Sequence, residues 1–154
     1  AGLMMTADGP KVLEYNTRFG DPETQAVLPR LRSDLADLLL AASKHGGLAG
    51  RELQWDPRWA VTVVIASAGY PDSPRVGDAI SGLEKITDPL ELTCAGVAGD
   101  DGNLVTAGGR VVNITALGET PAAARAAAYA GVESVDFKGK QTRTDIALRA
   151  EEAN

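Results

Sequence analysis

The chain has 154 residues, a net charge of −6 and a hydrophobic content of 44%, which are values typical of a soluble protein with one large core or two small ones. The acidic balance argues against the basic surfaces that bind nucleic acid or anionic membranes, and no apolar run approaches the roughly 20 residues of a membrane span. The single cysteine, Cys94, cannot form an internal disulfide, and its mixed apolar surroundings predict a buried thiol in a reducing, cytoplasmic environment.

The first predicted element is a β-hairpin, with strands over 2–6 and 11–16 joined by a turn at Ala7-Asp8-Gly9-Pro10. Glu14 and Asn16 then share one strand face, with Cα atoms about 6.6 Å apart. A carboxylate and an amide oxygen so placed suit Mg²⁺, which completes its coordination with water and phosphate oxygens. The same spacing also describes two hydrated side chains on a half-buried strand. An unpaired edge of the hairpin leaves either a monomer or an edge-strand dimer as the expected state.

A short loop then concentrates charged and turn-forming residues, namely Arg18, Gly20, Asp21, Pro22 and Glu23. Asp21 is predicted to cap a helix whose first position is Pro22. The free N–H groups at such a helix start lie beside Arg18, so an anion would be favoured there.

Two helices and a connector follow this loop. The sequence predicts a short helix over 22–28, ended by Pro29, and a longer one over 33–44 capped by Ser33. Residues 50–58 have the composition of a linker, so we predict one domain over 1–50 and a second over 51–154. Trp55 and Trp59 are expected to pack at this junction.

The second half is predicted to be mostly antiparallel β-structure with one helix, which makes the whole chain an α+β protein. We expect a buried strand over 60–66, a turn-rich loop over 67–74, a hairpin loop over 100–103, and shorter strands over 80–83, 90–95, 104–107 and 109–115. Thr120 is predicted to cap a helix over 121–132, whose alanine residues suit close packing on a sheet and whose Gly131 weakens its end. The tail over 151–154 is expected to fray.

The run Arg-Phe-Gly-Asp-Pro-Glu-Thr-Gln at 18–25 resembles the signature of the phosphoribosylamine-glycine ligases, also called glycinamide ribonucleotide synthetases. Glu14-Tyr15-Asn16 precedes it, as in that family. The resemblance extends over nearly the whole chain, through 66–71, 106–111 and 144–146. The chain departs from the family around Arg143 and Asp145, where a usual aromatic residue and a glycine are missing, so no role is predicted for that segment.

The resemblance implies an ATP-grasp ligase of purine biosynthesis. In that family ATP phosphorylates glycine, and the amine of 5-phosphoribosylamine attacks the resulting acyl phosphate, while divalent metal neutralises the phosphate charge. It implies that Glu14 and Asn16 bind Mg²⁺ or Mn²⁺ and that Arg18 is catalytic, stabilising a phosphoryl group or holding a carboxylate. It also implies a substrate-binding loop made of Gly20, Asp21 and Glu23, although Asp21 is equally well explained as a helix cap.

Family members are much longer, so the chain is expected to be a fragment that contains the end of an ATP-grasp domain and a small β-rich domain. The missing amino-terminal part would supply most of the ATP site, and the fragment alone is expected to be inactive, with small molecules rather than nucleic acid or membranes as its ligands. Two alternatives remain open. One is an ATP-grasp ligase for another acid and amine, and the other is a non-catalytic binding or assembly module derived from such an enzyme.

Overall fold

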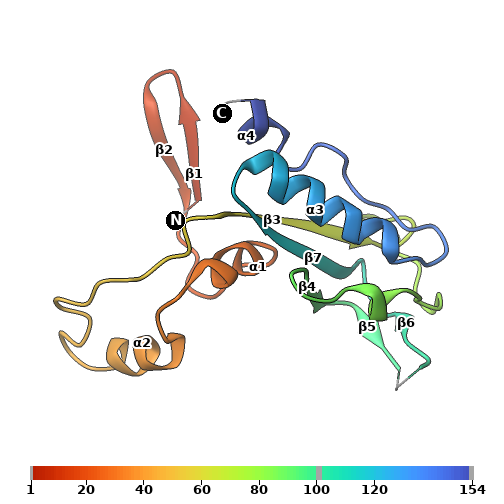
Figure 1. Ribbon diagram of the computed structural model, residues 1–154, viewed down its shortest axis with the longest axis horizontal. Coiled ribbons are helices and arrows are strands. Elements are labelled where there is room, and N and C mark those ends of the chain that lie inside the picture. Colours follow the sequence, from red (N-terminus) through yellow and green to blue (C-terminus); the bar gives the residue numbers. More distant parts are fainter. Residues whose placement is uncertain (1, 100–101, 153–154) are drawn as a thin grey trace.

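The computed structural model describes residues 2–99 and 102–152, beginning with a hairpin that stands apart from the other strands (Figure 1). Strand β1 (Gly2–Thr6) pairs antiparallel with β2 (Gly9–Glu14), and Thr6 lies directly opposite Gly9. The turn is therefore tighter than predicted, and the positive φ of 97° at Gly9 permits it. Strand β2 ends at Glu14, opposite the first residue of β1, so Asn16 lies two residues beyond the strand rather than within it.

Three short helical segments follow, and their starts differ from the predicted ones. Helix α1 (Glu23–Val27) has Pro22 at its N-cap position and no side-chain cap, so the prediction that Asp21 caps it is wrong. The 3₁₀ turn η1 (Leu28–Arg30) contains Pro29, and helix α2 (Leu35–Ala42) is capped by Asp34, whose side chain accepts from the Asp37 N–H at 3.0 Å. Ser33, the predicted cap, instead accepts from the backbone N–H of Gln54, because the linker returns beside it.

The core lies between an antiparallel sheet and one helix, as Figure 1 shows. Strands β3 (Trp59–Ala66), β7 (Arg110–Gly118) and β4 (Glu91–Cys94) pair in the order β3-β7-β4, and α3 (Pro121–Ser134) contacts β7 and β3. The Thr120 hydroxyl accepts from the Ala123 N–H at 3.1 Å, which confirms the predicted cap. The alanine side chains of α3 permit the predicted close packing, since both Ala124 and Ala128 are fully buried.

The two faces of this sheet have different partners. In β3 the fully buried Val63 and Ile65 alternate with the half-buried Thr62 and Val64. Val63 and Ile65 belong to the same core cluster as the buried residues of α3, so these side chains face the helix. Thr62 and Val64 face the other way and line a cleft together with Pro22. The beginning of α1 therefore lies over the sheet face that α3 leaves uncovered.

Smaller elements complete the fold. Strands β5 (Val97–Ala98) and β6 (Val105–Thr106) form the predicted hairpin, although its Asp100 and Asp101 lie outside the described residues. The predicted strand over 80–83 is wrong, because the chain makes only isolated bridges at Ala79 and Ser81 before the 3₁₀ turn η2 (Leu83–Lys85). A left-handed glycine at 82, with φ of 84°, ends the extended run.

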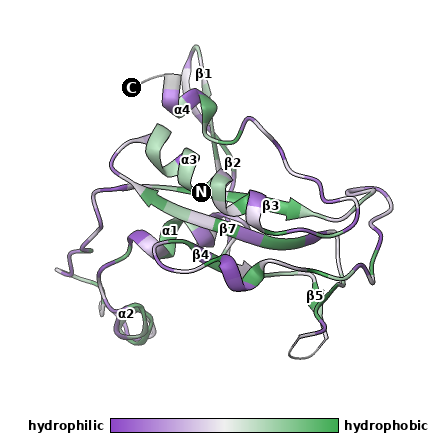
Figure 2. Cartoon of the chain, turned by 45° about the vertical axis from the view of Figure 1, so that its right-hand side comes forward, coloured by the Kyte–Doolittle hydropathy of each residue, from purple (hydrophilic) through white to green (hydrophobic). Residues whose placement is uncertain are grey.

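Two further expectations need correction. Cys94 is exposed rather than buried, because β4 is the outer strand of its sheet and Cys94 is its last residue. The tail is partly ordered, since α4 (Leu148–Glu152) includes residues 151 and 152, whereas 153 and 154 lie outside the described residues. Across 2–99 and 102–152, no helix is both long and apolar enough to span a membrane. Figure 2 shows that α2 is strongly apolar although it lies away from the core sheet.

Candidate functional site

The predicted metal ligands lie next to each other at the end of the hairpin. Glu14 is the last residue of β2, and the side-chain amide nitrogen of Asn16 lies 3.4 Å from Glu14 Oε1. Gly2 pairs with Glu14 across the hairpin, and a Cβ atom at Gly2 would come within 3.1 Å of Glu14 Cγ. The glutamate side chain thus lies over a position that has no side chain. The two side chains are adjacent even though Asn16 lies beyond the strand, and their convergence on a metal ion stays a prediction.

This pair fits a hard divalent cation that is mainly coordinated by other groups. In the described part of the chain, no three His, Cys, Asp or Glu side chains are grouped closely enough to hold a metal. Glu14 and Asn16 would therefore supply two oxygens, and water and phosphate oxygens would supply the others, as is usual for Mg²⁺. The amide of Asn16 would turn so that its oxygen faces the ion, since its NH₂ group can only donate.

Arg18 is exposed and makes little use of its charge within the chain. Its guanidinium donates to the carbonyl of the neighbouring Phe19 at 3.4 Å, and across the described residues it forms no ion pair. A guanidinium with unused donors is suited to binding a carboxylate or phosphoryl oxygen in two-pronged geometry. This arrangement is consistent with the predicted role of Arg18.

The loop between Arg18 and α1 is shaped by its own hydrogen bonds. The carbonyl of Gly20 accepts from the Thr24 N–H at 3.0 Å and from the Thr24 hydroxyl at 2.5 Å. The Gln25 amide donates to Asp21 Oδ1 at 3.0 Å. The position that a Gly20 side chain would occupy is taken by the Glu23 carboxylate, so these two predicted substrate-loop residues lie in contact. The three residues Gly20, Asp21 and Glu23 are thus held together by α1 itself.

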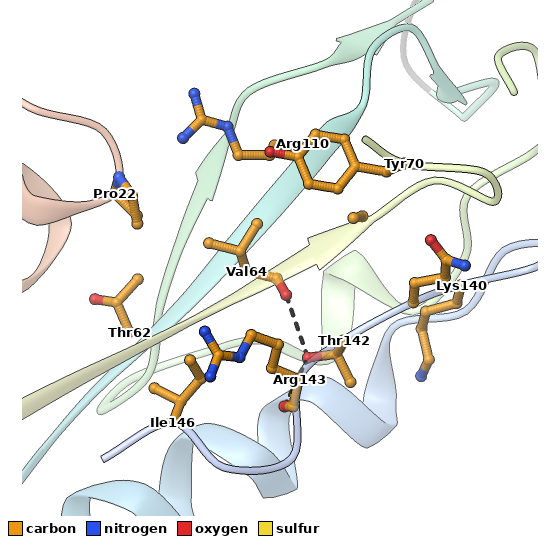
Figure 3. Close-up of a pocket in the computed structure, with 11 residues that line it drawn as sticks. Pro22, Thr62, Val64, Tyr70, Arg110, Lys140, Thr142, Arg143 and Ile146 are labelled. Atoms are coloured by element: carbon orange, nitrogen blue, oxygen red, sulfur yellow. Dashed lines mark hydrogen bonds between the residues drawn. The ribbon is translucent and has the colours of Figure 1, made fainter. Parts of the chain in front are cut away.

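A cleft of about 790 Å³ lies between this loop and the uncovered face of the core sheet (Figure 3). The side chains around it are Pro22, Thr62, Val64, Ala66, Tyr70, Arg110, Lys140, Gln141, Thr142, Arg143 and Ile146. Sequence reasoning did not predict this cleft. The signal that could have found it was the three later segments of family resemblance, because 66–71, 106–111 and 144–146 each contribute a residue to its wall.

Two cationic side chains of the cleft wall, Lys140 and Arg143, are bound by groups of the protein itself. Lys140 turns away, and its ammonium donates to the carbonyls of Val132 at 3.1 Å and Val135 at 2.7 Å at the end of α3. Arg143 binds Asp145 through two hydrogen bonds of 2.9 and 2.6 Å, and this contact lowers the pKa of the Asp145 carboxyl from its usual range. The ammonium of Lys140 and the guanidinium of Arg143 are therefore already bound within the protein.

A second cleft, of about 550 Å³, lies at the predicted domain junction. Trp55 and Trp59 line it together with Ala26, Val27 and Arg30 of the first helical segments. Both indole rings lie at the junction, as predicted, but they are 43% and 41% exposed and cover it only in part.

Comparison with known proteins identifies the family. A family model described as the C domain of phosphoribosylglycinamide synthetase matches residues 60–149, which is more than half of the chain. The chain belongs to the phosphoribosylglycinamide synthetase family. A second model, for the ATP-grasp (A) domain of the same synthetase, matches residues 1–24. The family predicted from the signature is thereby confirmed. The boundary predicted at residue 50 falls between the two matched segments and stays a prediction.

Relatives of the synthetase family are similar over almost the whole chain. A phosphoribosylamine-glycine ligase of Ralstonia nicotianae is 50% identical over 151 residues, which are 97% of this chain and 36% of that protein. A bifunctional purine biosynthetic protein of Pichia angusta is 49% identical over 151 residues, which are 97% of this chain and 19% of that protein. The chain therefore spans about a third or less of the length of these relatives.

A solved structure supports the fold in the same way. The phosphoribosylamine-glycine ligase of Thermotoga maritima superimposes with a TM-score of 0.71 at 39% identity, covering 94% of this chain and 35% of that one. This similarity confirms the predicted α+β class, with the end of an ATP-grasp domain followed by a small, mostly antiparallel domain with one packed helix.

Proposed function

We propose that the chain is the carboxyl-terminal part of an ATP-dependent ligase that joins glycine to 5-phosphoribosylamine in purine biosynthesis. One observation carries the proposal. The family's loop at 18–25 is intact in sequence, and it directly follows a carboxylate and an amide whose side chains meet 3.4 Å apart. The single thiol accords with a cytoplasmic enzyme.

In this proposal Glu14 and Asn16 bind Mg²⁺ or Mn²⁺. The metal would bring together and neutralise phosphate oxygens of ATP, which is the main requirement of phosphoryl transfer to a carboxylate. A carboxylate beside a neutral amide keeps the protein's own negative charge low, because the ion must also carry the triphosphate. The exposure of Glu14 leaves room for those additional ligands.

The loop residues have separate roles. Arg18 would be the catalytic cation, because its unused donors can bind the transferring phosphoryl group or the substrate carboxylate. Gly20, Asp21 and Glu23 would bind substrate, with the amine of glycine or phosphoribosylamine placed near the two carboxylates. These assignments agree with the packing of Glu23 against Gly20 and the fixed Asp21.

The chain alone would be inactive and would bind magnesium-nucleotide weakly, because it contains neither a glycine-rich lid nor a lysine placed for the nucleotide phosphates. The rest of the same polypeptide would supply them. Glycine, 5-phosphoribosylamine and ATP would be the ligands of the complete enzyme. Calorimetric titration of the isolated chain with magnesium-ADP tests this point, and tight binding would contradict it.

The decisive test is glycine-dependent ADP release by the longer protein in which this segment lies, with freshly generated 5-phosphoribosylamine and Mg²⁺. The substitution Glu14→Ala should lower kcat/KM by about 10³-fold, since a metal ligand stabilises the transition state by several kcal/mol. The matched control is Lys11→Ala, an exposed side chain on the same strand, which should retain activity within about twofold.

Other outcomes select the alternatives. ADP release with a different acid and amine, but not with these two, would keep the ATP-grasp chemistry and reject the substrates. Wild-type activity in the Glu14→Ala protein would reject the metal role. Absence of ADP release with every pair tried would favour a non-catalytic binding or assembly module.

A further inference from the structure

Arg110 connects the core sheet to the loop between Arg18 and α1. It is the first residue of β7, and its guanidinium donates to the backbone carbonyl of Asp21 at 2.7 Å. The same guanidinium pairs with the Asp21 carboxylate, with 3.3 Å between Nη2 and Oδ2. One arginine of the core sheet thus holds both the main chain and the side chain of a single loop residue.

The position of Arg110 is itself fixed by its surroundings. Its carbonyl accepts from the Gly96 N–H at 2.9 Å, and the preceding Gly109 carbonyl accepts from the Ser67 N–H at 2.8 Å. Gly109 lies so close to the Tyr70 ring that a Cβ atom there would overlap it. The backbone at Arg110 is therefore held firmly in place. Its side chain extends from there to a loop that has few other contacts with the sheet.

Asp21 is held from both sides as a result. Its Oδ1 accepts from Gln25, within α1, whereas its Oδ2 and its carbonyl are bound by Arg110. An ion pair between groups that are 38% and 41% exposed contributes little to global stability. The additional bond to the carbonyl sets the orientation of the peptide that leads into Pro22. Arg110 uses a separate nitrogen of its rigid planar fork for each contact, Nη1 for the carbonyl and Nη2 for the carboxylate, and the compact ammonium of a lysine does not reproduce that geometry.

We propose that Arg110 is a positioning residue for the ligase reaction, which docks Asp21 onto the core sheet and so orients Gly20 and Glu23 for substrate. It acts through Asp21 and needs no contact with substrate. The inference rests on the proposed function and extends it, because it assigns the carboxyl-terminal domain a direct part in forming the substrate loop.

The experiment compares Arg110→Gln with Arg75→Gln in the longer protein. Arg75 is a matched control, because it also pairs with an aspartate, Asp78 at 2.6 Å, and donates to a backbone carbonyl, that of Lys138 at 2.8 Å. It has similar exposure, 43%, but does not touch the loop. Arg110→Gln should lower kcat/KM by about ten- to a hundredfold, because the substrate groups would be slightly misplaced. Its Tm should equal that of Arg75→Gln.

Arg110→Lys provides the second variant, because it keeps the charge and loses the two-point contact. It should show a similar loss of kcat/KM with a wild-type Tm, so the test remains decisive even where Arg110→Gln fails to fold. Equal kcat/KM in wild type and Arg110→Lys would overturn the inference. An equal loss in Arg75→Gln would overturn it too, because the effect would then be a general one.

Amide hydrogen exchange tests the docking of the loop by Arg110 independently of the reaction that the enzyme catalyses. The Thr24 N–H, bonded to the Gly20 carbonyl, should exchange about tenfold faster in Arg110→Gln, while amides of β7 and the Arg75→Gln protein stay at wild-type rates. Unchanged exchange at Thr24 would overturn the positioning role whatever the substrates are. Faster exchange in a protein that lacks glycine-dependent activity would support the docking role and reject only the proposed reaction.

Discussion

Residues 2–58 and residues 59–149 differ in where their apolar side chains lie. In the described chain, Ala41 is the only buried hydrophobic residue before position 59, whereas the second region buries Val63, Ile114 and others completely. The first region exposes large side chains instead, with Met5 at 73% and Tyr15 at 75%. Yet every residue predicted to bind metal or substrate lies in the first region. Packing and proposed chemistry are thus separated along the sequence.

This difference shows that the second region supports the first. A two-stranded hairpin is held only by the backbone hydrogen bonds between its two strands and is marginally stable in water. The loop after it is anchored mainly through α1, which contacts β3 and β7, and through Arg110. We therefore expect substitutions in the core sheet to change stability and substitutions in the hairpin to change activity.

The largest expected effect on stability is that of Ile114→Ala in β7. Ile114 is fully buried within the core cluster, so its truncation removes buried surface and leaves a cavity. The free energy of unfolding of the chain should fall by about 3–4 kcal/mol, measured by urea denaturation.

Leu13→Ala is the matched truncation in the hairpin, where Leu13 is 65% exposed. It should change the free energy of unfolding by less than about 0.5 kcal/mol. A loss at Leu13 as large as that at Ile114 would show that the hairpin shares the core of the second region, and the proposed separation would be wrong.

A smaller effect is expected for Gly131→Ala in α3. The added methyl group would lie 2.7 Å from Ile114 Cγ2 and 3.0 Å from Leu90 Cδ1, so either these side chains or the helix must shift. Overpacking of this kind costs about 1–3 kcal/mol, against a gain of about 1 kcal/mol in helix propensity. We expect a net loss of about 1 kcal/mol in thermal or urea unfolding.

Ala126→Gly measures the propensity contribution alone, because Ala126 is exposed on the same helix. It should cost about 1 kcal/mol. If Gly131→Ala instead stabilises the chain, the close approach of α3 to β7 is not needed for packing.

Sequence reasoning predicted well wherever the pattern was local. The buried strand predicted over 60–66 and the helix start at Thr120-Pro121 each depend on neighbouring residues, and the structure has them close to the predicted positions. The prediction that Ser33 caps α2 is wrong because Ser33 and Asp34 are adjacent and both can cap a helix. The hydroxyl of Ser33 instead accepts from the distant Gln54 N–H, and Asp34 is the cap.

The remaining differences depend on contacts between distant residues. Gly131 is predicted to weaken the end of its helix, but α3 continues to Ser134, and Gly131 packs closely against Ile114 of β7. The exposure of Cys94 follows from the position of β4 at the sheet edge, which its own sequence does not specify. The contact between Arg110 and Asp21 joins residues 89 positions apart, and no periodicity could predict it.

A pH-dependent effect is expected at Asp56, which ties the linker to the first helical segments. Its buried carboxylate pairs with Arg58 at 2.8 Å and with Arg32, and hydrogen bonds from these two arginines hold the pKa of Asp56 well below its usual range. Because the pKa is lower in the folded chain than in the unfolded one, the stabilisation is complete above the ordinary aspartate pKa of about 4 and is lost as the pH falls below it.

Asp56→Asn tests this joint through its pH dependence. The substitution should reduce stability modestly at pH 7, because Arg32 and Arg58 can be solvated at 60% and 35% exposure, and the difference from wild type should narrow as the pH falls from 5 to 3. Urea midpoints at each pH measure it, with Asp72→Asn, an exposed loop carboxylate, as the control. A difference that stays constant over this range would mean that the charge of Asp56 does not hold the linker against the first region, and that only the neutral hydrogen bonds around it do.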